Sequence, residues 1–287
     1  MHLITSQEDL LKYLPNVLAS VKGEASLLDK LAPALSMSEQ WVIEDFLGQN
    51  LFDSVCKSEE DNMLRIYTSR IIIIDAFRRS IPSLDLILTP NGFGVVSNTN
   101  IAPASKERVQ RLIESLYSER DWQIKLLMVL LAQQQSWRLS EQGRFFAATL
   151  FPNMRICNLI GVEKMQWEKF LEIRPLLIAI EDHLTANWIG SEQMAAFRQE
   201  AQAHDKGNSL LMQQVLQSLQ SYVVRQLKLQ LSGASITPCN TPASLVHIID
   251  IIRKHPEDFP LWHNSEMAQV FAPKIYENRL HDKGYWF

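Results

Sequence analysis

The sequence lacks the features of a membrane-spanning protein, of a disulfide-bonded secreted protein and of a zinc-binding protein. Its three cysteines, Cys56, Cys157 and Cys239, are odd in number and widely separated, which fits neither a disulfide framework nor paired zinc ligands. The longest apolar runs, 71–74 and 126–132, are far shorter than the roughly 20 residues that a membrane-spanning helix needs. The first residues lack the basic start and apolar stretch of a signal peptide. We therefore expect reduced thiols, no membrane anchor and a cytoplasmic protein.

The chain also lacks an excess of positive charge. It carries 28 Lys and Arg against 32 Asp and Glu, with a net charge of −4 and an isoelectric point near 6.0. A nucleic-acid-binding protein normally concentrates Lys and Arg on one face, so a broad electrostatic footprint is excluded. A local contact to phosphate through Arg78, Arg79 and the segment 106–111 stays open as an alternative. Acidic residues interspersed with these cations favour a mixed, salt-bridged surface instead.

What the chain does have is apolar residues at helical spacing. Hydrophobic residues make up 46% of the 287 positions, with only 10 Gly and 12 Pro, which is typical of a globular protein with a substantial core. Thr5 and Glu8 have the spacing of a capping box, and Ser38 is expected to begin a second helix. The run 71–74 is compatible with a strand, but its polar flanks favour a helix that ends at Pro82. Helices are predicted near 6–20, 38–47, 59–81, 105–131, 145–150, 163–188, 191–203, 209–231 and 241–254, and an extended segment at 154–161.

One segment between two of these helices predicts a β-hairpin. Two short β-prone runs flank Pro90-Asn91-Gly92, so residues 86–96 are expected to form a hairpin with its turn at this point. Phe93 lies between two glycines near the tip. Its ring either folds back onto neighbouring helices or contacts a partner, because loop tips serve both purposes. We single out Phe93 and Val95 as candidate partner-binding residues.

A faint internal repeat predicts that the chain contains two related modules. Residues 43–50 (IEDFLGQN) are echoed by 180–187 (IEDHLTAN), and 103–105 (PAS) is echoed by 242–244. The order and spacing of the two matches agree. We therefore expect a mainly α protein made of two related helical-bundle modules, residues 1–136 and 137–287, with the hairpin only in the first.

The last residues carry three aromatic side chains, Tyr285, Trp286 and Phe287. A terminus is ordered only when it docks onto something. These aromatics pack either on the protein's own surface or into a neighbouring subunit, and we include them among the candidate partner-binding residues.

Combinations of residues that could support catalysis are weak. Glu, Asp and His at 181–183 are consecutive, and consecutive helical residues point about 100° apart, so they cannot converge on one substrate atom. Cys239, His247 and Asp250 share only residue types with a cysteine–histidine nucleophile pair. The sequence therefore predicts no catalytic residue and a protein that is not an enzyme.

Sites for metals and cofactors are also weakly indicated. His255, Glu257, Asp258 and His263 lie in a proline-broken stretch, but their spacing matches no established metal motif. The Gly-Phe-Gly at 92–94 lacks the third glycine and the strand–helix context of a phosphate-binding loop. We expect solvated loop residues at the first place, a turn at the second, and no cofactor.

Two blocks of the sequence resemble a known group of proteins. The first is LTPNGFGVVSN at 88–98, which continues into APASK at 102–106; the second extends from Phe145-Phe146 through Asn158 and Gly161 to Arg174-Pro175 and Glu181. Both resemble uncharacterised proteins of Bacteroidetes and of their phages and prophage-like elements, which are similar in outline to head–tail connector or neck proteins.

That resemblance implies a non-enzymatic role in virion assembly. It implies a homo-oligomer that also contacts other virion proteins, with the 86–96 hairpin bridging to a neighbour by strand addition. The protein would then be made in the bacterial cytoplasm and become part of the virion. The alternative is a nucleic-acid-associated packaging factor, and an enzyme without a recognisable local motif is the third possibility.

Overall fold

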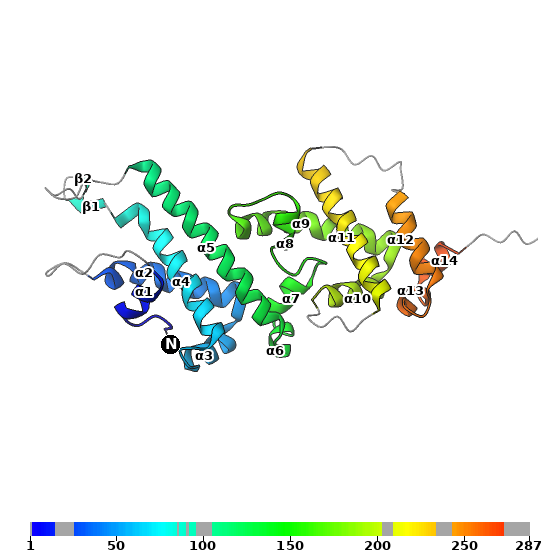
Figure 1. The fold of residues 1–287 in the computed structure, drawn as a ribbon, viewed down its shortest axis with the longest axis horizontal. Helices are drawn as coiled ribbons and strands as arrows, with labels where there is room; N and C mark the ends of the chain where they lie inside the picture. Colours follow the sequence, from blue (N-terminus) through cyan, green and yellow to red (C-terminus); the bar gives the residue numbers. More distant parts are fainter. Residues whose placement is uncertain are drawn as a thin grey trace, which may run out of the picture. The chain divides into compact units, whose positions relative to one another are not determined.

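In the computed structural model, the described residues are 2–14, 26–84, 86–89, 92–95, 105–202, 209–233 and 243–272, with the backbone alone at 86–89 and 92–95. Almost all of the regular structure is helical, which confirms the predicted mainly α fold (Figure 1). The chain forms two compact units. The first comprises Met1–Ile178 and Ala201–Lys206, and the second comprises Ala179–Glu200 and Gly207–Phe287. No described helix is long and apolar enough to cross a lipid bilayer.

The first unit begins with two helices, and each has a serine as its N-cap. In α1 (Gln7–Tyr13) and α2 (Leu27–Val42), the Ser6 and Ser26 hydroxyls accept from the backbone N–H three residues later, and an aspartate there completes each capping box. The first box therefore lies one residue after the predicted Thr5 and Glu8 pair. Ser38 does not begin a helix: it lies inside α2, and its hydroxyl donates to Asp75 at 2.9 Å.

A π-helical turn, η1 (Ile43–Leu47), follows α2 and ends at Gly48. Gly48 has φ 72° and ψ 156°, a backbone conformation that is essentially restricted to glycine. This residue ends the turn and lets the chain enter α3 (Gln49–Lys57) directly.

Two long helices form the centre of the first unit. In α4 (Met63–Leu84) the isoleucines at 71–74 are buried, which confirms the helical interpretation, although Pro82 lies inside the helix instead of ending it. The strands β1 (Leu86–Thr89) and β2 (Gly92–Val95) follow, and then α5 (Lys106–Ala132). Figure 1 shows the strands at the far end of α4, before the chain returns along α5.

Shorter helices complete the first unit. They are α6 (Gln135–Arg138), α7 (Glu141–Ala147), α8 (Arg155–Leu159) and the greater part of α9 (Gln166–Leu184). The prediction of an extended segment at 154–161 was wrong. Ile156 and the adjacent Cys157 are both buried while Asn158 is exposed, a pattern that fits one helical face and not the alternation of a strand.

An aromatic cluster holds these helices together. The Phe46 ring lies 4.6 Å from the Trp167 ring and 6.2 Å from the Phe146 ring, and Phe170 stacks on Phe146 at 6.2 Å. Each of these four side chains is at most 3% exposed. The cluster therefore joins η1, α7 and α9 into one core by apolar burial and ring contacts.

The second unit repeats this organisation. The end of α9 passes into a second π-helical turn, η2 (Thr185–Ile189), and Gly190 leads into α10 (Ser191–Gln202). The helices α11 (Leu210–Leu231), α12 (Ala243–Lys254), α13 (Pro260–His263) and α14 (Glu266–Val270) follow. Phe197, Phe259 and Trp262 are almost fully buried at its centre.

The two series of elements from α2 to α7 and from α9 to α14 share specific features. Each first helix contains an internal proline, Pro33 or Pro175, and is followed by a π-helical turn. Each turn ends at a glycine of nearly the same geometry, since Gly190 has φ 82° and ψ 155°. The long helices α4 and α11 each have 22 residues. These shared features support the predicted internal duplication.

The strongest shared feature is a tryptophan that binds the π-helical turn. The indole Nε1 of Trp137 donates to the Phe46 carbonyl at 2.6 Å, and that of Trp262 donates to the Trp188 carbonyl at 3.1 Å. Phe46 and Trp188 occupy the same position, the fourth residue of their turns. In both copies a serine three residues after the tryptophan donates to the tryptophan carbonyl at 2.6 Å.

The structure corrects the predicted register of the repeat. Residues 43–50 were matched to 180–187, but 180–184 belongs to α9, and the equivalent of η1 is η2 at 185–189. The matched segment in the second copy therefore begins five residues before η2, because the same residue types occur both in η1 and at the end of α9.

The predicted module boundary between 136 and 137 also needs correction. Trp137, Phe146, Trp167 and Phe170 pack in the first unit, in the cluster that contains Phe46 or on its edge. The first compact unit therefore continues to Ile178, well past residue 136.

Candidate functional site

The β1–β2 ribbon is the first candidate site. The two strands pair antiparallel as a two-stranded sheet, and no other described strand pairs with them. The register places Leu86 opposite Val95, Ile87 opposite Gly94, Leu88 opposite Phe93 and Thr89 opposite Gly92.

This register indicates which backbone groups lie on the outer edges of the ribbon. In a hairpin with a two-residue turn, the residues next to the turn exchange hydrogen bonds, and alternate pairs follow the same rule. Thr89 and Ile87 then use their backbone groups inside the ribbon. The outward backbone groups belong to the remaining strand residues, which are Leu86, Leu88, Phe93 and Val95.

The structure thus places Phe93 and Val95, two predicted partner-binding residues, on the outer edge of β2. The other three, Tyr285, Trp286 and Phe287, lie outside the described residues. The segment 233–240, where the second module is expected to lack a hairpin, lies outside the described residues except for Gly233.

The arginines considered for nucleic-acid contact are engaged with a buried carboxylate. Asp75 is fully buried and accepts from Arg78 at 2.8 Å and from Arg79 at 2.5 Å. Arg120, only 2% exposed, reaches the same carboxylate at 3.3 Å and pairs with Glu168 at 2.6 Å. Arg78 and Arg79 therefore both have a carboxylate partner on their own helix. The contacts that join α4 to α5 here are those of Arg120 with Asp75 and of Arg78 with the Tyr117 hydroxyl, at 2.9 Å.

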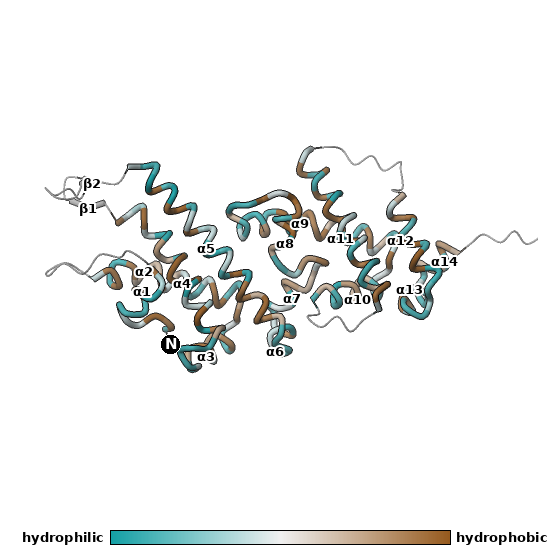
Figure 2. Tube along the Cα trace, in the orientation of Figure 1, coloured by the Kyte–Doolittle hydropathy of each residue, from teal (hydrophilic) through white to brown (hydrophobic). Residues whose placement is uncertain are grey.

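The two buried aspartates of this cluster differ in their pKa shifts. Burial alone would raise the pKa of Asp75, but the hydrogen bonds and charges of Arg78 and Arg79 outweigh it and hold that pKa below its ordinary value. For Asp121, burial dominates over the attraction of Arg120 and raises the pKa. The remaining predicted cations, at 106–111, lie on the exposed and hydrophilic start of α5 (Figure 2).

The residues considered for catalysis do not converge. Glu181 is fully buried and pairs with Arg198 at 3.1 Å, while Asp182 and His183 are exposed on α9. His247 is exposed on α12, and Cys239 lies outside the described residues. Burial raises the pKa of the Cys157 thiol to about 11, so this cysteine is protonated at neutral pH.

One group of described residues has side chains close enough to share a metal ion. Ligand atoms of His255, Glu257 and Asp258 lie within 4.8 Å of one another, and His255 Nδ1 is 3.4 Å from a Glu257 oxygen. The three follow α12 in an exposed or half-buried turn. Exposed acidic groups commonly gather in this way without binding a metal.

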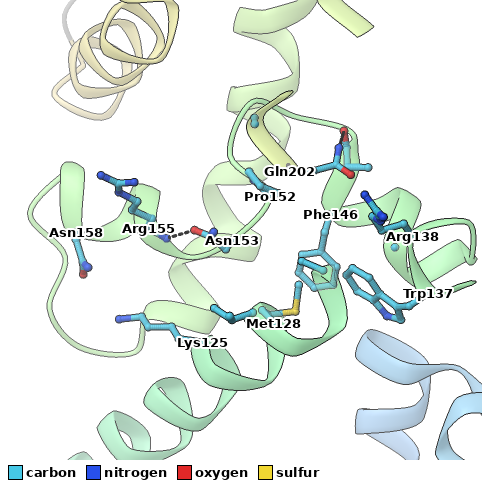
Figure 3. Close-up of a pocket in the computed structure, with 15 residues that line it drawn as sticks. Lys125, Met128, Trp137, Arg138, Phe146, Pro152, Asn153, Arg155, Asn158 and Gln202 are labelled. Carbon is cyan, nitrogen blue, oxygen red and sulfur yellow. Dashed lines mark hydrogen bonds between the residues drawn. The ribbon is translucent and has the colours of Figure 1, made fainter. Parts of the chain in front are cut away.

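Sequence reasoning missed a cavity of about 510 Å³ in the first unit. Its wall comes from α5, α6, α7, the segment 152–158 and the two α10 residues that belong to this unit. Figure 3 shows Met128, Phe146 and Trp137 along one side of the cavity, with Pro152 and Gln202 across from them. No local pattern could have revealed it, because its residues are separated by up to 77 positions in the chain, from Lys125 to Gln202.

Comparison with known proteins gives a partial match. Residues 7–147, just under half of the chain, match the model described as "Family of unknown function (DUF6712)". The match ends at Ala147, the last residue of α7, so it contains α1 and the whole first copy of the repeat. No curated protein and no solved structure matches the chain.

Proposed function

We propose that the chain is a non-enzymatic structural protein of a phage or prophage, of the head–tail connector kind. It assembles with copies of itself and with other virion proteins through the β1–β2 ribbon. The virion setting rests on the resemblance of segments 88–106 and 145–181 to phage and prophage proteins. The mode of assembly rests on the ribbon.

The observation that carries the proposal is a two-stranded sheet at the end of a helical unit, with no described strand on either edge. A two-stranded ribbon is marginally stable by itself, and its outer N–H and C=O groups are a template for another strand. Strand addition by a neighbour satisfies these groups. Many such weak contacts become cooperative when identical subunits close into a ring.

The structure offers less support for the alternative of a nucleic-acid-associated packaging factor. Arg78 and Arg79 have ionic partners in Asp75, and only the cations at 106–111 are left for a phosphate contact. If the protein retards DNA in a gel-shift assay and replacing these cations does not change the shift, no described site for DNA is left.

The test is a pair of proline substitutions in β2, whose outer edge carries Phe93 and Val95. Phe93→Pro removes an N–H that points to the outer edge, where proline is tolerated, while Gly94→Pro removes an N–H from inside the ribbon. Assembly size is measured by sedimentation velocity and electron microscopy, alone and with the products of neighbouring genes.

We expect rings or higher oligomers from the wild type and their loss in Phe93→Pro, with the melting temperature of the helical units unchanged. Gly94→Pro reports the effect of disturbing the ribbon itself. Assembly that survives both substitutions, or the absence of any association with virion proteins, would refute the proposal.

A further inference from the structure

The cavity of the first unit has the size and lining of a small-molecule site. Its volume of about 510 Å³ falls in the range of about 300 to 1,000 Å³ that such sites occupy. The wall is largely apolar, and its apolar members are Met128, Val129, Ala132, Trp137, Phe146, Ala147 and Pro152.

Small residues keep this space open. Ala132 ends α5 and Ala147 ends α7, and both are half-buried at the wall. At position 143 only glycine fits, because a Cβ there would lie 2.1 Å from the Trp137 carbonyl oxygen. Larger side chains at 132 or 147 would fill the cavity, and the sequence does not place them there.

All the charged residues of the wall are cations. Lys125, Arg138 and Arg155 line the cavity, and no acidic side chain does. None of the three forms an ion pair with an acidic residue in the part of the chain that the structure describes. This contrasts with Lys164, Arg120 and Arg78 of the same unit, which all have carboxylate partners.

The cations lie at two ends of the apolar wall. Figure 3 shows Lys125 and Arg155 near Asn158 on one side, and Arg138 beside Trp137 on the other, with Met128 and Phe146 between them. A ligand in the cavity would place its apolar body over Met128 and Phe146 and its charged head at either end.

We infer that this cavity binds a small molecule with an apolar body and an anionic head, of the fatty-acid or aromatic-acid class. The apolar body displaces water from the wall, which supplies most of the affinity. The anionic head forms an ion pair with Lys125, Arg138 or Arg155, and this ion pair makes the site prefer acids to alcohols. This binding goes beyond the assembly function and does not depend on it.

The experiment compares decanoate with decanol, both below the concentration at which decanoate forms micelles, by isothermal titration calorimetry on the full chain. The triple variant Lys125→Gln, Arg138→Gln, Arg155→Gln removes the cations of the wall. A matched triple variant, Arg108→Gln, Arg111→Gln, Arg144→Gln, removes three exposed cations that do not line the cavity. Ala132→Phe fills the apolar part.

We expect decanoate to bind the wild type more tightly than decanol. The wall variant should weaken decanoate by about threefold to tenfold, because the single carboxylate pairs with the one or two largely exposed cations at one end, and leave decanol unchanged within about twofold. The matched variant should behave as wild type, and Ala132→Phe should abolish both.

The inference is overturned if decanoate gives no binding, if the two triple variants weaken it equally, or if Ala132→Phe, with an unchanged melting temperature, still binds. None of these results bears on the ribbon, because the wall variant keeps β1 and β2 intact. Its assembly by sedimentation velocity is measured in parallel, so that failure of the ligand and failure of the assembly function are distinguished.

Discussion

Trp137 is the residue whose replacement best tests how the repeated unit is stabilised. Its indole is 5% exposed, and its Nε1 donates to the Phe46 carbonyl at 2.6 Å. Trp137→Phe keeps a ring in the core but removes the donor. A buried acceptor left without its partner costs about 1 to 3 kcal/mol, and the smaller ring leaves unfilled space. We therefore expect the first unit to lose about 2 to 4 kcal/mol of unfolding free energy.

Trp122→Phe is the matched control, because Trp122 is 56% exposed on α5. Its cost should stay within about 0.5 kcal/mol. Urea denaturation gives the free energies, and hydrogen exchange of peptides covering η1 and α6 locates the loss, since a chain of two units need not unfold in one step. Equal costs for the two substitutions, or unchanged exchange at η1, would show that the Trp137 indole does not stabilise the turn.

Three further substitutions test the charge cluster and the turns. Asp75→Asn leaves three guanidinium groups around a neutral amide and should cost about 3 to 5 kcal/mol at neutral pH by urea denaturation. Because the folded-state pKa of Asp75 is lowered, its contribution is fully present above the unfolded value of about 3.9 and is lost as pH falls through the folded value. The gap between wild type and Asp75→Asn should therefore stay constant from pH 7 to about 5 and close only in stronger acid; a gap that closes near pH 6 would contradict this. Gly48→Ala and Gly190→Ala should each cost about 1 to 3 kcal/mol of backbone strain in their own unit, read by hydrogen exchange; no loss in either would show that the turns relax.

Much of the helical framework could be predicted from the sequence. The apolar periodicity of 105–131 and 209–231 matches α5 and α11 to within one or two residues, because long amphipathic helices carry the clearest pattern. Helix starts were less certain, since neighbouring Thr5 and Ser6 both have the residues of a capping box and only the backbone decides between them.

The sequence indicated the repeat, but it matched residues that are not structurally equivalent. Ile-Glu-Asp at 43–45 lies in η1, whereas Ile-Glu-Asp at 180–182 lies in α9. The equivalent positions are those that precede Gly48 and Gly190 at the same distance. A better signal was present: Trp137-x-x-Ser-Glu and Trp262-x-x-Ser-Glu have the same spacing, because the tryptophan and serine hold the same turn in each unit.

Tertiary features could not be predicted from local patterns. Acidic residues near Arg78 and Arg79 indicate salt bridges in the sequence, but only the structure shows that their partner Asp75 is buried and also binds Arg120, 45 residues away. The cavity depends on residues from several elements for the same reason. Each of these features comes from packing between elements and not from the pattern of any one of them.

The proposed assembly requires the outer edge of the β1–β2 ribbon to contact another subunit. The most direct measurement is photo-crosslinking of the assembled protein with benzoylphenylalanine at Phe93, with the same probe at the exposed Trp122 as the control. Assembly through the ribbon should give crosslinked dimers and larger species from position 93, with the crosslinked peptide on a neighbouring chain. Crosslinks from position 93 that are confined to the same chain would contradict it.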